Sequence, residues 1–166
     1  MATTNLGSTS FQTIAERRAY VQQKSSTGIS HLDVRATYKI LTVEEGGKKY
    51  ADITKEAFFY KQDGETHDFP AFQVESDNGG KNTVALATLR NKEEFDAFNQ
   101  LVKCVAPSNA LYVFDRNAPL EDVADKVDEL LQDGDLYLHV ITTPIAKKGK
   151  FGTFTGSLTV CWLARS

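Results

Sequence analysis

The chain has 166 residues, a formal net charge of −3 and a hydrophobic fraction of 41%. These values fit one globular domain with a core of its own, and no apolar run approaches the roughly 20 residues that a membrane-spanning helix needs. The first ten residues hold neither a basic nor an apolar stretch, so we expect no secretory signal. We therefore expect the chain to stay in the cell that makes it.

Charge is divided unevenly along the chain. Residues 1–40 carry five Lys and Arg against two acids, residues 41–131 carry ten against eighteen, and residues 132–166 carry four against two. Both ends are basic and the middle is acidic. This division would suit a shell subunit with one basic face, or a solvated surface without special significance. A protein that only coats nucleic acid usually has a stronger basic excess.

The N-terminal segment is rich in Ser, Thr, Gln and Asn and holds few large apolar side chains. We predict a flexible arm over residues 1–30 that orders on a neighbouring chain, followed by a single α+β domain over residues 31–166. The alternative for part of the arm is a short helix around Thr13–Gln23, which would carry Arg17 and Arg18.

A long hairpin is predicted next. Residues 31–44 alternate apolar and polar side chains, a Gly46-Gly47 turn signal follows, and residues 49–61 return with a second apolar face. The aromatic run at 58–60 supplies both faces of this strand, which is typical of a central strand or of an interface. The candidate assembly residues are Phe58, Tyr60, Phe11 and Tyr20.

Two shorter strands are predicted over residues 69–75 and 83–89, separated by a turn that contains Gly79 and Gly80. Pro70 lies near the start of the first of them, and proline cannot donate a ladder hydrogen bond, so we expect an edge position. A further short strand is predicted over residues 111–114.

Two amphipathic helices are predicted in the second half. The first covers residues 92–105, with Asn91 as its N-cap and Phe95 and Phe98 in the core. The second has Pro119 near its first turn and ends at Asp133-Gly134. Its predicted buried stripe is Leu120, Val123, Val127, Leu130 and Leu131. Its predicted exposed side is Glu121, Asp122, Asp125, Asp128 and Glu129.

The end of the chain alternates with a period of two over residues 136–141 and again over residues 158–163. The segment 143–152 between them contains Pro, Gly and three lysines and is too short for a crossover helix. It predicts a loop that joins two antiparallel strands. The two cysteines, Cys104 and Cys161, lie in apolar surroundings and are expected to be buried thiols.

No local pattern predicts catalysis. The three histidines, His31, His67 and His139, lie far apart, and neither zinc spacing nor a nucleophile or phosphate-binding motif is present in the sequence. We therefore predict no catalytic residue, no metal and no cofactor. An enzyme whose residues come from dispersed loops stays open as a third alternative.

Nucleic-acid contact is predicted at two basic positions. Lysines near aromatic side chains can meet phosphates and stack on bases, and the 143–152 loop holds both kinds of residue. Arg17 and Arg18 form the second basic position. The candidate residues are Lys147, Lys148, Lys150, Arg17 and Arg18, and the alternative for the lysines is a solubilising loop tip.

The order of elements at the end of the chain resembles that of small virus coat proteins. A helix precedes the strand Gly134-Asp135-Leu136-Tyr137-Leu138-His139-Val140, and a Pro/Gly loop leads to the strand Gly156-Ser157-Leu158-Thr159-Val160-Cys161-Trp162. This order is similar to the last two strands of a viral jelly roll, and the Ser/Thr-rich N-terminal segment is similar too. The resemblance implies a coat or capsid subunit of a virus or bacteriophage.

These observations together predict an α+β fold with a predominantly antiparallel sheet, either jelly-roll-like or of another coat type, and two amphipathic helices. The function we expect is that of a non-enzymatic structural protein that assembles with copies of itself. Its partners would be other copies and nucleic acid, and no membrane. The alternative is a β-barrel module that binds single-stranded nucleic acid.

Overall fold

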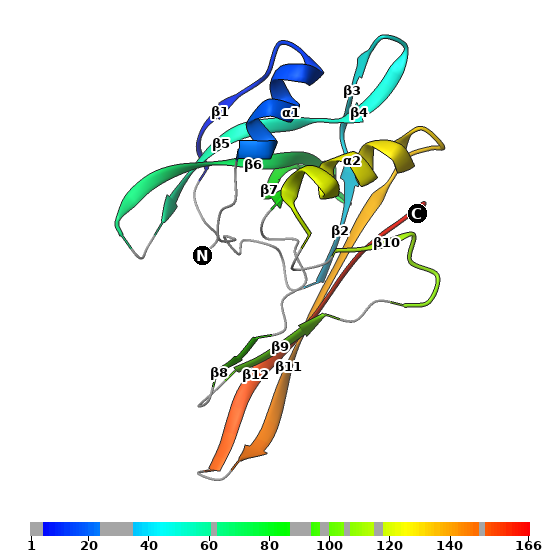
Figure 1. Cartoon of the computed structure of the whole chain (residues 1–166). Coiled ribbons are helices and arrows are strands. Elements are labelled where there is room, and N and C mark those ends of the chain that lie inside the picture. The colour runs from blue at the N-terminus through cyan, green and yellow to red at the C-terminus, as the bar shows by residue number, and fades with distance from the viewer. Residues whose placement is uncertain are drawn as a thin grey trace.

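The computed structural model describes residues 5–23, 35–60, 63–86, 94–96, 100–104, 107–114, 118–149 and 152–166. Figure 1 shows the chain as a sheet-rich body with two helices and one long hairpin. In chain order the elements are β1 (Asn5–Thr9), α1 (Ile14–Gln23), β2 (Arg35–Ile40), β3 (Thr42–Glu45), β4 (Lys48–Ala51), β5 (Ile53–Tyr60), β6 (Glu65–Ser76), β7 (Lys81–Ala85), β8 (Glu94–Asp96), β9 (Gln100–Cys104), β10 (Tyr112–Val113), α2 (Leu120–Leu131), β11 (Tyr137–Gly149) and β12 (Gly152–Ala164).

Ten strands form one sheet in the order β1-β5-β6-β2-β11-β12-β9-β8, with β7 paired to β6 and β10 paired to β12. β3 and β4 form a separate two-stranded sheet. The described strand pairs are antiparallel except β12 with β9, which is parallel. The predicted α+β class with a mostly antiparallel sheet and two helices is therefore confirmed. The jelly roll is not, because that fold packs two sheets, each with its own set of strands, face to face.

The predicted second helix is confirmed as α2. It begins at Leu120, directly after Pro119, and its apolar stripe faces the sheet, where Leu120, Val123 and Val127 are buried. The partners across the core come from β2 and β11, among them Leu138. Burial of each such side chain contributes about 1.5–3 kcal/mol.

The helix predicted over residues 92–105 is wrong. Its described residues form β8 and β9, and β9 pairs in parallel with β12 from Ser157 to Thr159. Apolar residues in so short a run fit either period, and pairing with a neighbouring strand overrides local helix propensity. Phe98 lies outside the described residues and the side chain of Phe95 is not described, so their predicted burial remains a prediction.

The predicted hairpin over residues 31–61 is confirmed around its turn and wrong further out. β3 and β4 pair across Gly46 and Gly47, but their continuations, β2 and β5, do not pair with each other and instead pair with successive parts of β6. The two strands diverge at Leu41 and Asp52. The Leu41 N–H donates to the Gln73 carbonyl at 2.9 Å, and the Asp52 N–H donates to the Leu41 carbonyl at 2.8 Å. Gln73 of β6 therefore lies where the two strands diverge.

The strand predicted over residues 69–75 is confirmed as part of β6, but its expected edge position is wrong. β6 has β7 on one side and, one after the other along its length, β5 and β2 on the other. Pro70 is tolerated because it pairs with Lys55 of β5, while pairing with β7 begins only at Ala71. At the proline itself the strand has a described neighbour on one side only. The predicted short strands at 83–89 and 111–114 correspond to β7 and β10.

The two terminal strands are antiparallel as predicted, but the loop expected over residues 143–152 is wrong. β11 and β12 stay in register as far as Gly149 opposite Gly152. Pro144 does not end β11, because described pairing with β2 stops at Ile141 and the proline has a strand neighbour on one side only among the described residues.

Residues 5–23 of the predicted arm form β1 and α1. β1 pairs with β5, and α1 packs on α2 with Ile14 and Val21 buried. The helix starts where Thr13 accepts a hydrogen bond from Glu16 N–H at 3.1 Å, which is a typical N-cap. Of the two alternatives for Thr13–Gln23, the structure therefore has the short helix. Residues 24–30 lie outside the described residues.

Candidate functional site

The two arginines of α1 differ in environment. Arg17 is only 2% exposed and forms an ion pair with Asp128 of α2, so its guanidinium does not lie where a phosphate could reach it. Arg18 is exposed, and its side-chain nitrogen lies 3.5 Å from a carboxylate oxygen of Asp125 in α2. Of the two arginines predicted to contact nucleic acid, only Arg18 lies at the surface.

Arg17 and Asp128 join three elements. The guanidinium also donates to the carbonyl of Ala51 in β4, and the other carboxylate oxygen of Asp128 accepts from Ala51 N–H at 2.8 Å. Burial raises the pKa of Asp128, while Arg17 and the Ala51 amide act in the opposite direction. The sequence placed Asp128 on the exposed side of α2, and this is wrong: the side chain is buried because β4 and α1 cover it.

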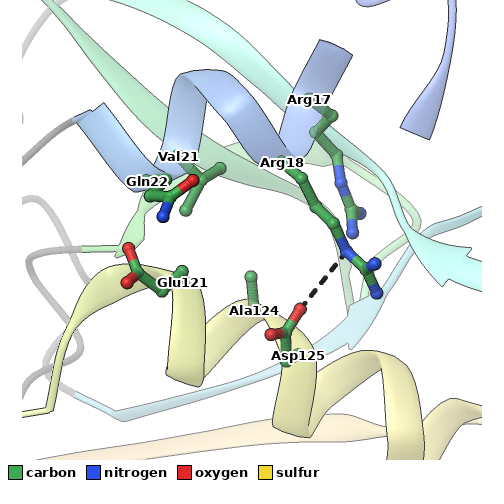
Figure 2. A pocket seen from close by; sticks show the side chains of 7 residues that line it. All are labelled: Arg17, Arg18, Val21, Gln22, Glu121, Ala124 and Asp125. Carbon is green, nitrogen blue, oxygen red and sulfur yellow. Dashed lines mark ion pairs between the residues drawn. The ribbon is translucent and has the colours of Figure 1, made fainter. Parts of the chain in front are cut away.

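A pocket of about 210 Å³ lies between α1 and α2 beside this ion pair (Figure 2). Val21 and Ala124, which are buried, lie at its apolar base, and Arg17 and Gln22 also line it. Its charged rim comes from Arg18, Glu121 and Asp125. Binding sites for drug-sized ligands run from about 300 to 1,000 Å³, so this pocket suits a side chain better than a cofactor.

The long hairpin holds the predicted lysines. Lys147 and Lys148 belong to β11, close to the end of its register with β12, and Lys150 lies outside the described residues. Figure 1 shows this end of the hairpin extending away from both helices. Lys147 and Lys148 are therefore not in a ten-residue loop, because the paired strands continue to Gly149 and Gly152.

One edge of β11 has no strand partner among the described residues. Pairing with β2 covers Tyr137–Ile141, whereas pairing with β12 continues to Gly149. Eight residues, 142–149, therefore have a described neighbour on one side only. A row of such unshared backbone groups is a template for pairing with another chain.

The candidate assembly residues differ in exposure. Phe58 is 1% exposed and packs against Phe69, with 6.0 Å between ring centroids. Phe11 and Tyr20 are half-buried and contact each other, with ring centroids 5.2 Å apart. The side chain of Tyr60 is not described. Phe58 therefore contributes to a second small core.

Other large apolar side chains are exposed and were not singled out by the sequence. Val43, Phe59, Leu111 and Val113 are each between 38% and 44% exposed. Phe59 belongs to the aromatic run, and its exposure follows from strand alternation, because its neighbour Phe58 takes the buried face. Single exposed apolar residues are common, so they define no site alone.

Sequence reasoning missed a buried carboxylate in β5. Glu56 is fully buried, and one of its oxygens accepts from the Thr54 hydroxyl at 2.7 Å and from the Gln73 amide at 2.9 Å. The other oxygen has no hydrogen-bond partner among the described residues. Alternation alone could have flagged it, since Thr54, Glu56 and Phe58 share one face.

Among the described residues, Asp63, Glu65 and His67 could hold a metal ion, with ligand atoms within 4.8 Å of one another. The sequence predicted no metal site, because it sought helical or Cys/His spacing, whereas this set spans a turn and the start of β6. All three side chains lie at or near the surface. A 2.6 Å hydrogen bond between Asp63 and His67 accounts for their proximity without an ion.

No family model matches the sequence, no curated protein is similar to it, and no solved structure matches its fold. Within the described part of the chain, the helices are too short and too polar for any of them to cross a bilayer.

Proposed function

We propose that this chain is a structural subunit that assembles with copies of itself, as the coat proteins of small viruses and bacteriophages do, and that it belongs in a virion. The observation that carries the proposal is the edge of β11 over residues 142–149, which has no strand partner among the described residues. A two-stranded ribbon is marginally stable in water, and it gains stability when a further strand or another chain covers it.

The residues of this edge restrict how a partner can pair with it. Pro144 cannot donate a ladder hydrogen bond, and Lys147 and Lys148 place positive charge near its end. Edges with proline and lysine resist indiscriminate pairing. The edge therefore favours a partner in one register with complementary charge, which is what a regular assembly requires.

The test is the molar mass of the chain in solution, measured by size-exclusion chromatography with light scattering. A shortened variant replaces residues 146–155 with Asn-Gly, so that Ile145 and Gly156, which are already partners, flank a two-residue turn. We expect the parent to form a defined oligomer or a closed particle and the shortened variant to remain folded but dissociate. A parent that stays monomeric at all concentrations would overturn the proposal.

The second candidate function is binding of single-stranded nucleic acid. The observation that favours it is the position of Lys147 and Lys148 at the far end of the hairpin, away from the acidic α2 (Figure 1). If each of the three lysines neutralises one phosphate, Lys→Gln at positions 147, 148 and 150 should flatten the log–log salt slope by about 0.7 per lysine on single strands. Equal slopes for parent and variant would exclude this function.

A further inference from the structure

Two oppositely charged features lie at opposite ends of the molecule. The basic one is the end of the β11/β12 hairpin with Lys147 and Lys148. The acidic one is the rim of the pocket between α1 and α2, which carries Glu121 and Asp125. Figure 1 shows the hairpin extending away from both helices, so the two features of one chain do not meet.

The charges around the pocket do not cancel. Arg17 is neutralised by Asp128 behind the pocket, and Arg18 lies 3.5 Å from Asp125 at its rim. Glu121 then remains, with no ion pair among the described residues. The pocket therefore presents a net negative rim above the apolar surface of Val21 and Ala124.

This combination suits a lysine side chain. A lysine has a four-carbon stem that packs on apolar surface and an ammonium group that stays near the carboxylates. The Arg18–Asp125 pair does not prevent this, because both side chains are more than half exposed and an exposed pair contributes only about 0–1 kcal/mol. A cationic partner can therefore compete for Asp125.

We infer that the pocket between α1 and α2 binds the lysine-bearing end of the β11/β12 hairpin of a second copy of this chain. The inference rests on the proposed self-assembly and names the surfaces involved. Since donor and acceptor surfaces differ, the contact is heterologous, and each copy can accept one neighbour and reach another. Such contacts produce rings or open filaments, according to whether the rotation closes.

Charge reversal tests the contact in the full-length chain. One variant carries Lys147→Glu and Lys148→Glu, a second carries Glu121→Lys and Asp125→Lys, and a third combines all four changes. We expect each of the first two to raise the dissociation constant of the assembly at least about tenfold, because like charges then face each other. The combined variant should recover assembly, because the charges are again complementary.

A matched control carries Asp77→Lys and Asp133→Lys, which change net charge as much as the pocket reversal but at exposed positions outside the pocket. Thermal melting of each variant confirms that it is folded. If the parent assembles but both reversals behave like the control, or the combined variant fails to recover, the inference is wrong and self-assembly stands. If the parent is monomeric, both the proposed self-assembly and this inference are wrong.

Discussion

The ion pair between Arg17 and Asp128 is the residue-scale feature that fixes the N-terminal helix in place. Both side chains are nearly inaccessible, and each also contacts the backbone of Ala51. The Arg17 guanidinium lies 5.8 Å from the centre of the Tyr50 ring, which adds a cation–π contact from the neighbouring residue of β4. Three elements distant in sequence therefore depend on one pair of charges.

We predict that Asp128→Ala lowers the free energy of unfolding by about 3–5 kcal/mol, because it leaves the Arg17 cation buried without its partner. The double variant Arg17→Met with Asp128→Leu should lose much less, since no unpaired charge remains. Arg18→Ala removes the exposed ion pair with Asp125 and should change the free energy of unfolding by less than about 1 kcal/mol. Urea unfolding measures all three, and equal losses for the single and double variants would contradict this account.

The turn before β6 predicts a pH dependence. The pKa of Asp63 lies below 3.8 because its carboxylate accepts from Glu65 N–H at 2.9 Å and, second, from the His67 side chain. A depressed pKa in the folded state means that the turn is stabilised above pH 3.8 and loses this contribution as pH falls through the lower value.

An NMR titration of the Asp63 carboxyl should therefore have its midpoint below 3.8. In His67→Ala the midpoint should rise but stay below 3.8, because the larger contribution, from the backbone amide of Glu65, remains. A midpoint at or above 3.8 in the parent would show that this turn does not form in solution.

At this scale the sequence predicted the apolar residues better than the polar ones. Strand and helix periods identified Leu120, Val127 and Leu138 as core. The same periods assigned Asp128 to the exposed side and left Arg17 as a surface cation. A buried ion pair depends on which distant elements meet, and neither residue carries a local signal that its partner lies more than a hundred positions away.

At the scale of elements, the β3/β4 hairpin depends on its turn. Gly46 and Gly47 both have positive φ, 59° and 78°, which is the type I′ geometry that matches strand twist. This hairpin supports both helices: Glu45 accepts from Ile14 N–H at 2.9 Å, and the Gln132 side chain donates to the carbonyl of Lys49. Changes to the turn should therefore affect α1 and α2.

We predict that Gly46→Val lowers the free energy of unfolding by about 1–2 kcal/mol, whereas Gly46→Asn changes it by a few tenths. A Cβ atom at this position would meet nothing within 4 Å, so the cost comes from the backbone conformation, which asparagine tolerates and β-branched residues do not. Denaturant midpoints compare the two variants. Indistinguishable midpoints would mean that the turn adopts another conformation.

The elements with a strong local signal were predictable and those defined by pairing were not. A few adjacent residues predict the Gly46-Gly47 turn, and Pro119 with the apolar stripe that follows predicts α2. β9 does not, since its pairing with β12 joins residues more than fifty positions apart. The continuation of β11 past Pro144 was missed because proline was taken as a strand end, although an edge with no partner among the described residues accommodates it.

At the scale of the whole molecule, the fold class could be predicted but the topology could not. The alternation of the strands predicts a mostly antiparallel sheet. It does not say that β2 and β5 both pair with β6, or that β2 lies beside β11, because those choices depend on how the whole set of apolar faces is covered. The pocket between α1 and α2 was unpredictable for the same reason.

The two contacts proposed for assembly respond differently to salt, and this gives the last prediction. Pairing along the β11 edge uses backbone hydrogen bonds, which carry no net charge. The contact between the hairpin lysines and the pocket at Glu121 and Asp125 is ionic, and the screening length falls from about 10 Å at 0.1 M salt to about 3 Å at 1 M.

We therefore expect high salt to weaken the head-to-tail contact while edge pairing persists, so that the molar mass from light scattering falls in a step to a smaller oligomer and not to the monomer. The variant with Glu121→Lys and Asp125→Lys should show that smaller oligomer already at low salt, with little further change up to 1 M. A parent whose mass is independent of salt would leave edge pairing as the sole contact, because an ionic contact at an exposed rim must respond to screening.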